Sequence, residues 1–326
     1  MNRVLIVHTW GIGDWLYFTP VLKGLVAKYP HAQIDVLLGT PMARAIMDYY
    51  PEVRVVGVGD VTKGFWSVVY HVLKSRRNKY DLLLFSAGVS SRKADLLSLL
   101  IRAEQKVALR TVSHIPLFLT AWKNYDYKKH ILENNLQLRS LIGLEITEKV
   151  CTYLPHEKSV EIMPNSLLIH PGCNSTHSYK RWPVKRFVQV ANNLLNGGRS
   201  VSVVLGPDEL EMKDDFSSLQ KFSSFRLLMN LSFANLLEEI SKHELFFCSD
   251  SALGHIAAAL DKLVVTILGP GDPVITRPYS KKTRVLRTER NLNCMPCMRP
   301  GGKHGCHERS CLTDITVEKS RRCDEK

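Results

Sequence analysis

The chain has 326 residues, 45% of them hydrophobic, and a formal net charge of +13 at pH 7. This length exceeds what one hydrophobic core usually organises, so we expect two domains. No run of about 18 uninterrupted apolar residues occurs, which argues against a transmembrane helix. The first residues lack the charged, apolar and small-residue order of a signal peptide, so we expect a cytoplasmic protein whose eight cysteines are mostly reduced.

Strand-like apolar runs alternate with helical patterns along the whole chain. In the first half, strands are predicted at 4–8, 33–38, 53–58 and 81–86, with helices near 14–29, 41–49 and 64–78. In the second half, strands are predicted at 166–170, 200–205, 244–248 and 263–268, with helices near 184–196, 209–221, 233–241 and 252–260. The alternation predicts an α/β protein with two doubly wound, mostly parallel sheets.

The stretch around 154–165 has no hydrophobic periodicity and contains two prolines. We therefore expect a linker at 156–165 between a domain at 1–155 and a domain at 166–326. Two such domains in tandem direct the carboxyl ends of both sheets toward a shared cleft, where ligands of open α/β sheets bind. Chemistry is accordingly expected at strand ends.

The first predicted strand runs into Gly11, Gly13 and Asp14, where a helix begins. A dinucleotide fingerprint would need a third glycine near position 16, which is Leu16, so an oxidoreductase using a nicotinamide cofactor is disfavoured. Asp14 could cap the helix. An ionised carboxylate that faces a hydroxyl substrate in a cleft could equally act as a general base.

The segment 170–183, which follows the first strand of the second half, is rich in hydroxyl groups. Ser175 and Thr176 can supply hydroxyl donors, and Lys180 an ammonium, to phosphate oxygens. A solvated loop is the other interpretation. The segment ends in Lys180-Arg181-Trp182-Pro183 before a helix, and Pro183 suits the first helical turn.

Two later strand ends also carry polar residues. After the strand that ends at Leu205, Glu209 could accept the vicinal hydroxyls of a ribose, whereas Asp208 could cap the next helix. The segment 246–259 passes from a strand through small residues into an alanine-rich helix, whose amides form an anion site. His255 in this segment could orient a phosphate or fill space against the sheet.

These motifs, in this order, resemble the ADP-heptose:lipopolysaccharide heptosyltransferases, the inverting glycosyltransferases of family 9, whose GT-B fold has two Rossmann-like domains facing a central cleft. The resemblance runs from residue 3 to roughly 275. It is carried by GIGD at 11–14 with Thr19-Pro20, KRWP at 180–183, GPDE at 206–209, DSALGHIAAAL at 250–260 and LGPGDP at 268–273. The family often has glycine where this chain has Ala252.

The resemblance implies that Asp14 is the catalytic base and that Lys180, with Ser175 and Thr176, holds a diphosphate and stabilises its leaving charge. It implies a nucleotide-sugar site that also includes Gly13, Glu209, Asp250, Ser251, Ala252, Leu253 and His255. The donor would be ADP-heptose and the acceptor a phosphorylated lipopolysaccharide core, with no cofactor required for catalysis.

Basic residues gather in clusters at 74–77, 128–129, 180–186 and 281–282. Any one cluster is also typical of a solvated surface. Their field attracts phosphates of nucleic acid, of an anionic leaflet or of a small molecule. With a lipid-embedded acceptor, Arg76, Arg77, Lys128 and Lys129 suit the anionic inner-leaflet surface, which predicts peripheral attachment to the inner membrane.

The end of the chain contains four closely spaced cysteines, Cys294, Cys297, Cys306 and Cys311. They form a C-x2-C pair, then eight residues, then a C-x4-C pair, and His304 and His307 lie among them. Thiolates at such spacing in a reducing compartment fit a tetrahedral structural site for zinc or iron. Free buried cysteines are the alternative.

Three other functions fit part of the sequence. The same motifs would serve a transferase with another nucleotide sugar, or with a protein acceptor such as an autotransporter. A nucleic-acid-binding protein would fit the charge. The chain lacks interleaved aromatic residues and a recognition module, however, so no nucleic-acid partner is expected.

Overall fold

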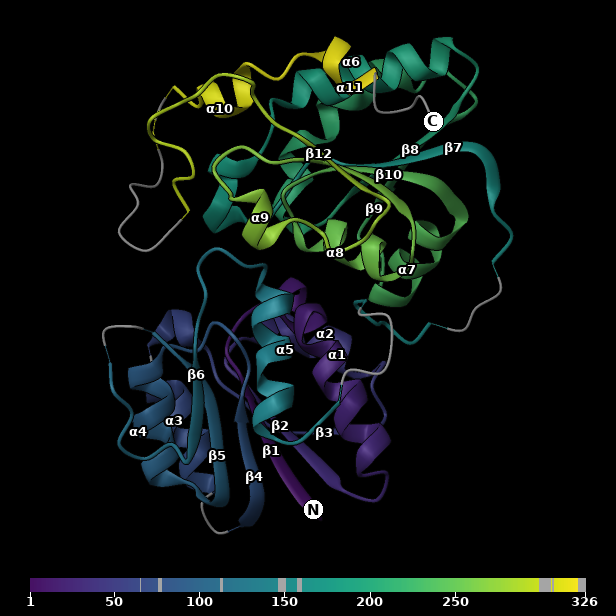
Figure 1. The fold of residues 1–326 in the computed structure, drawn as a ribbon. Helices are drawn as coiled ribbons and strands as arrows, with labels where there is room; N and C mark the ends of the chain where they lie inside the picture. The colour runs from purple at the N-terminus through teal and green to yellow at the C-terminus, as the bar shows by residue number, and fades with distance from the viewer. Residues whose placement is uncertain are drawn as a thin grey trace. The chain divides into compact units, whose positions relative to one another are not determined.

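The computed structural model describes residues 1–64, 66–75, 78–111, 114–145, 151–156, 160–298, 306 and 308–321. The chain divides into two compact units, Met1–Pro155 and His156–Lys326. Each unit contains a six-stranded parallel sheet with helices on both of its faces (Figure 1). The structure thus confirms the predicted α/β class with two doubly wound sheets.

The sheet of the first unit has the strand order β3-β2-β1-β4-β5-β6. Its central strands are buried on both faces and read as apolar runs, as parallel strands do. The strands are β1 (Arg3–His8), β2 (Gln33–Leu38), β3 (Val53–Val58), β4 (Lys79–Phe85), β5 (Arg102–Arg110) and β6 (Ala121–Asn124).

Helices cover both faces of this sheet. The α-helices are α1 (Ile12–Lys28), α2 (Arg44–Met47), α3 (Trp66–Ser75), α4 (Ser91–Leu100) and α5 (Ile131–Leu141), and the 3₁₀ segments are Pro41–Ala43 and Val61–Lys63. One core cluster joins α3 and α4 to the sheet through Leu5, Val7, Leu83 and Phe85. Helices α1 and α5 contact each other and lie on the opposite face (Figure 1).

Helix α1 continues through Pro20, which lies inside it. Proline has no amide hydrogen, so the carbonyl of Leu16 loses its usual helical donor. The hydroxyl of Thr19 donates to that carbonyl at 2.7 Å. It also accepts the amide of Tyr153 at 2.9 Å. The Thr19-Pro20 pair therefore keeps the helix intact and attaches the end of the first unit to it.

The sheet of the second unit has the order β12-β11-β10-β7-β8-β9. Numbered within the unit and seen from the other edge, this is the same 3-2-1-4-5-6 order as in the first. The strands are β7 (Met163–His170), β8 (Ser200–Leu205), β9 (Phe225–Met229), β10 (His243–Ser249), β11 (Leu263–Ile267) and β12 (Thr283–Leu286). Strand β7 begins at Met163, inside the predicted linker, because Met163 pairs with His243 of β10.

The second unit has its main core on the face covered by α6. The helices are α6 (Val184–Asn196), α7 (Phe233–Lys242), α8 (Ala252–Ala259), α9 (Pro273–Thr276), α10 (Ser310–Thr313) and α11 (Val317–Arg321), with 3₁₀ segments η3 (Ser175–Lys180) and η4 (Pro207–Leu219). Leu312 and Ile315 are fully buried in this core. The indole of Trp182 donates to the carbonyl of Ile315 at 3.1 Å, so the C-terminal segment belongs to the packed unit.

Candidate active site

The first candidate position lies where the strand order of the first sheet reverses. Strands β1 and β4 are neighbours there, although β2 and β3 separate them in sequence. Ligands of doubly wound sheets bind at such a switch point, outside the carboxyl ends of the strands. His8 ends β1 and Ser86 follows β4, and His8 Nδ1 lies 2.9 Å from Ser86 Oγ. The turn that leads to Asp14 therefore starts from a hydrogen-bonded pair at the switch point.

His8 holds this turn through its second ring nitrogen. Nε2 lies 3.2 Å from the carbonyl oxygen of Gly11. Because a carbonyl only accepts, Nε2 carries the hydrogen and Nδ1 accepts from Ser86. Burial lowers the pKa of His8 to about 4, against the raising effect of its backbone hydrogen bonds. The ring is therefore neutral at pH 7. The role of His8 was not predicted, because its only signal in the sequence is a polar residue at the end of an apolar run.

Asp14 occupies the first turn of α1, but it does not cap the helix. The N-cap is Gly11, in an extended conformation and without a side-chain cap, and Gly13 is buried. The capping alternative for Asp14 is therefore wrong. The positive end of the helix dipole stabilises its carboxylate as an anion. Burial raises the pKa of Tyr125 to about 12, and the charge of Asp14 contributes to this rise.

The second candidate position is the equivalent switch point in the other unit, between β7 and β10. Ser249 ends β10, and its hydroxyl donates to the carbonyl of Pro171 at 2.9 Å and accepts the amide of Trp182 at 3.3 Å. These bonds fasten the segment 171–182 to the end of β10. They bring together Lys180 and Asp250, which lie 70 residues apart in sequence.

Lys180 and Asp250 form a partly buried ion pair. Lys180 Nζ lies 3.0 Å from Asp250 Oδ2. Burial lowers the pKa of Lys180, but the charge and hydrogen bond of Asp250 outweigh it and leave this pKa above its usual value. An ammonium has three donors, so donors remain for phosphate oxygens. Burial lowers the pKa of His255, on α8, to about 4, while Asp250 raises it and Lys180 lowers it further, so this imidazole is neutral at pH 7.

Ser175 and Thr176 are exposed on η3, before Lys180. Asn174 caps this 3₁₀ segment by accepting the amide of Thr176 at 3.0 Å, and the hydroxyl of Thr176 donates to the same oxygen at 2.5 Å. The structure therefore places both hydroxyl residues on the segment that presents Lys180.

Ser251 is the N-cap of α8, and Ala252 and Leu253 form its first turn. The hydroxyl of Ser251 lies 3.0 Å from Nδ1 of His170, the last residue of β7. His170 Nε2 in turn lies 3.6 Å from Glu209 Oε2. A polar chain therefore connects the start of α8 with Glu209.

Glu209 is only 3% exposed. Its Oε2 accepts the amide of Gly206 at 3.0 Å, so Glu209, and not Asp208, supplies the carboxylate at the start of η4. The capping role considered for Asp208 is wrong for that reason. Burial raises the pKa of Glu209, but His170, the Gly206 amide and Arg181 together bring it below its usual value.

Arg181 ties the segment 171–182 to the start of η4, and the sequence analysis missed this role. Its Nη2 donates to the carbonyls of Cys173 at 2.8 Å and Asp208 at 2.6 Å, and it lies 3.4 Å from Glu209 Oε1. The KRWP motif was the available signal. Its arginine holds the backbone carbonyls of Cys173 and of Asp208, the residue before Glu209.

The four cysteines predicted to bind metal differ in their burial. Cys297 and Cys311 are buried, and Cys294 and Cys306 are exposed. Burial, and then the charges of Cys297, Cys306 and Cys294, raise the pKa of Cys311 to about 11. His304 and His307 lie outside the described residues. Within the described ranges, no group of three or more His, Cys, Asp or Glu side chains is arranged to hold a metal ion.

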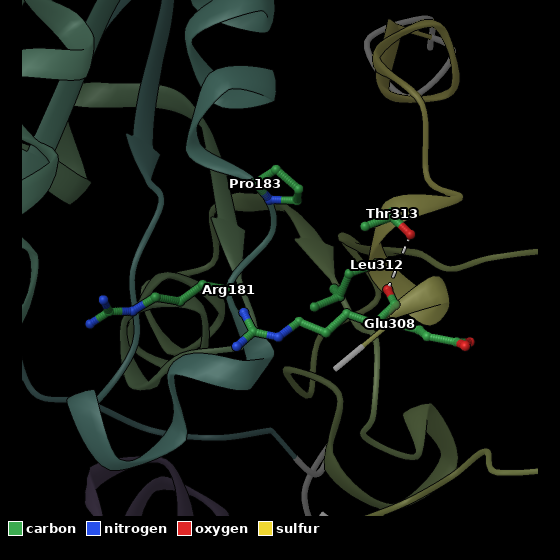
Figure 2. A pocket seen from close by; sticks show the side chains of 6 residues that line it. Arg181, Pro183, Glu308, Leu312 and Thr313 are labelled. Atoms are coloured by element: carbon green, nitrogen blue, oxygen red, sulfur yellow. Dashed lines mark hydrogen bonds between the residues drawn. The ribbon is translucent and has the colours of Figure 1, made fainter. Parts of the chain in front are cut away.

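A pocket of 380 Å³ adjoins Arg181 in the second unit. Pro183, Glu308, Arg309, Leu312 and Thr313 complete its lining, and Figure 2 shows Pro183 and Leu312 contributing from separate segments. The hydroxyl of Thr313 donates to the carbonyl of Arg309, at 3.4 Å. None of the residues predicted to bind the donor lines this pocket, although Arg181, which does, lies 3.4 Å from Glu209.

Comparisons with known proteins decide the family. The model described as "Glycosyltransferase family 9 (heptosyltransferase)" matches residues 70–307. The chain belongs to glycosyltransferase family 9. It is 24% identical over 313 residues to lipopolysaccharide heptosyltransferase 2 of Escherichia coli strain K12, covering 87% of this chain and 88% of the relative.

Solved structures share the fold of this family 9 glycosyltransferase. A family 9 glycosyltransferase from Veillonella parvula superposes with a TM-score of 0.77 at 19% identity, covering 99% of this chain and 96% of that one. The E. coli heptosyltransferase WaaC with ADP superposes with a TM-score of 0.73 at 19% identity and covers 99% of both chains. In the part of this chain that the structure describes, no helix is both long and apolar enough to cross a membrane.

Proposed function

We propose that this glycosyltransferase transfers a heptose from ADP-heptose to a lipopolysaccharide core, with inversion at the anomeric carbon. The cluster at the switch point of the second sheet carries the proposal, because Lys180 and Asp250 meet there beside the start of α8, the helix that contains His255. Curated relatives named lipopolysaccharide heptosyltransferases and a structural relative solved with ADP support the donor and acceptor classes.

In this proposal Asp14 is the general base. The acceptor hydroxyl gives its proton to the Asp14 carboxylate while its oxygen forms a bond to the anomeric carbon. His8 keeps the turn before Asp14 in place through the carbonyl of Gly11. A base that is already ionised and held by the first helical turn needs no reorganisation before it accepts the proton.

The second unit is proposed to stabilise the leaving ADP. As the bond from the anomeric carbon to the diphosphate oxygen breaks, that oxygen keeps the electron pair. Lys180, the hydroxyl of Ser175 and the start of α8 are proposed to bind the resulting charge, together with the hydroxyl of Thr176 once it turns from Asn174 to the diphosphate. Glu209 is proposed to meet the ribose through Oε1, which lies 3.4 Å from Arg181. No step in this mechanism uses a metal ion.

The acceptor places the reaction at a lipid surface. A lipopolysaccharide core carries phosphates and is anchored in a bilayer, so we propose that the protein works at the cytoplasmic surface of the inner membrane. Lys128 and Lys129 are exposed in the first unit and suit an anionic acceptor by charge. Arg76 and Arg77, predicted for the same role, lie outside the described residues.

A panel of nucleotide sugars tests the donor. Purified protein is incubated with ADP-heptose, with other ADP- and UDP-linked sugars, and with a lipopolysaccharide acceptor that lacks the outer heptose. We expect transfer from ADP-heptose. Turnover with another nucleotide sugar alone, or with an autotransporter protein in place of lipopolysaccharide, would replace the proposed substrates while leaving the transferase class intact.

Two variants test the assigned roles. Asp14→Asn should retain ADP-heptose affinity and lose transfer by about 10²- to 10⁴-fold, the usual contribution of a general base. Lys180→Met should weaken donor binding by about 10- to 100-fold, since it removes a charge-assisted hydrogen bond. Asp48→Asn and Lys185→Met change exposed residues of the same types and serve as controls. Normal turnover in Asp14→Asn, or normal donor affinity in Lys180→Met, would contradict the role concerned.

A further inference from the structure

Helix α3 of the first unit is apolar on two faces. Val68, Val69 and Val72 pack into the core beneath it. Trp66, Tyr70 and Leu73, at positions i, i+4 and i+7 of the same helix, are exposed, and Trp66 is 78% exposed. A helix that only covers a sheet needs one apolar stripe, with polar residues outside. The outer stripe of α3 therefore needs another explanation.

Two neighbouring segments extend this stripe. Helix α4 contacts α3 and lies beside it on the same face of the sheet (Figure 1). Its outer residues Leu96 and Leu99 are exposed. The segment 114–118 adds three more exposed side chains, Ile115, Leu117 and Phe118, of which Leu117 is 78% exposed. We call the exposed apolar side chains of these three segments the α3–α4 face.

Asp95 of α4 holds the segment 114–118 in an unusual way for a surface loop. The amides of Leu117 and Phe118 donate to its buried carboxylate at 3.0 Å and 2.7 Å, and His114 Nε2 lies 3.2 Å from it. Pro116 has no amide hydrogen. The loop's amides from 116 to 118 are therefore satisfied by the protein and do not need water. A loop with this property can place its side chains in an apolar phase without exposing unpaired amides.

Within the three segments that form the α3–α4 face, the exposed charge has one sign. In the described residues 66–75, 91–100 and 114–118, Asp95 is the only acid, and it is buried. Lys74, Arg92 and Lys93 are exposed. Lys74 Nζ lies 5.2 Å from the centre of the Tyr70 ring, so the charge sits next to the apolar stripe. A second copy of this chain would bring the same positive charge to the contact, which opposes self-association through this face.

We propose that the α3–α4 face binds the surface of an anionic lipid bilayer. Trp and Tyr favour the boundary between headgroups and acyl chains, and leucine and isoleucine side chains insert beyond it. Lysine and arginine beside them pair with lipid phosphates. The inference rests on the proposed function in so far as the acceptor is lipid-anchored, and it adds the surface by which the enzyme reaches that lipid.

Vesicle flotation with the full chain tests this surface without donor or acceptor. The probes are vesicles of phosphatidylethanolamine with phosphatidylglycerol, and vesicles of phosphatidylcholine alone. We expect binding to the anionic vesicles that falls with added salt, together with a blue shift of tryptophan fluorescence. The double variant Ile115→Ser with Leu117→Ser should weaken vesicle binding at least about tenfold, because it lacks two large apolar side chains whose transfer from water into the bilayer favours binding. Both substitutions keep the backbone bonds to Asp95.

Separate variants of the other elements and a control sharpen the result. Trp66→Ser and the pair Arg92→Gln with Lys93→Gln should each weaken binding to anionic vesicles several-fold. Ile162→Ser, at an exposed position of the second unit, should bind as the wild type does. Equal binding of wild type and all α3–α4 variants, or no binding to anionic vesicles at all, overturns the inference. If the α3–α4 variants differ from the wild type in molar mass by light scattering but bind vesicles equally well, the face contacts a second copy of the chain, and the inference is overturned as well.

Transfer assays separate this inference from the proposed function. The α3–α4 variants should retain wild-type rates with a deacylated, soluble core acceptor and lose rate with the same acceptor embedded in vesicles. A wild-type protein that binds vesicles but transfers no heptose would contradict the proposed function and leave the lipid surface standing. Heptose transfer that is equally fast in all variants with the vesicle acceptor would contradict only the lipid surface.

Discussion

Replacing His8 by glutamine should remove part of the acid sensitivity of this protein. His8 is fully buried beneath the turn before Asp14, with Ser86 and the Gly11 carbonyl as its partners. Glutamine also has one donor and one acceptor end, so it can retain both contacts. Unlike histidine, it does not bind a proton between pH 4 and 7.

The magnitude follows from the pKa of the buried ring. The folded value is about 4, against 6.5 for a free histidine. Between these values the unfolded chain binds the proton and the folded chain does not, so the free energy of unfolding falls as pH falls. The contribution of His8 is fully present above pH 6.5 and is lost by about pH 4. At about 1.4 kcal/mol per unit, roughly 2 kcal/mol of stability is lost between about pH 7 and about pH 5.

Urea unfolding of wild type and His8→Gln at these two pH values measures the effect. The difference in unfolding free energy between the two pH values should be about 2 kcal/mol smaller in the variant. His255 and His243, whose pKa values burial also lowers, are present in both proteins and cancel in the comparison. His31→Gln, at an exposed position, is the control and should behave as the wild type. An identical loss in wild type and His8→Gln would refute the reasoning.

Two further predictions concern the second unit. A Cβ at Gly172 would lie 2.1 Å from the side chain of Glu209, so Gly172→Ala should lower the free energy of unfolding by about 1–3 kcal/mol and weaken donor binding. Gly197→Ala is the control: its Cβ would lie 3.4 Å from the nearest atom, so neither quantity should change. Chelation of metal ions by EDTA should leave the rate of heptose transfer unchanged, because no proposed step uses a metal. Elemental analysis of the same sample reports whether Cys297 and its neighbouring cysteines carry zinc or iron. A transfer rate that is lost on chelation and restored by added metal would count against the mechanism.

The pattern of apolar and polar residues was enough to predict the central strands and the class of fold. Val4–Val7, for example, is a continuous apolar run, and it forms the middle of β1 because a parallel strand covered on both faces needs no polar residues. Strands β5 and β6 of the first unit, and the edge strands β9 and β12 of the second, were missed. Much of β5 is exposed and polar, and β6 lies at the sheet edge with three of its four residues exposed, so neither shows the pattern of a buried strand.

The motifs likewise identified the segments of the candidate site, but not the contacts within it. Nothing local to His8 indicates Ser86, 78 residues away, and nothing local to Lys180 indicates Asp250. Hydrophobic periodicity reports whether a residue faces a core, a property that each segment carries by itself. Which polar side chains meet depends on the order of strands in the sheet, and that order arises from packing the whole unit, so it appears only in the tertiary structure.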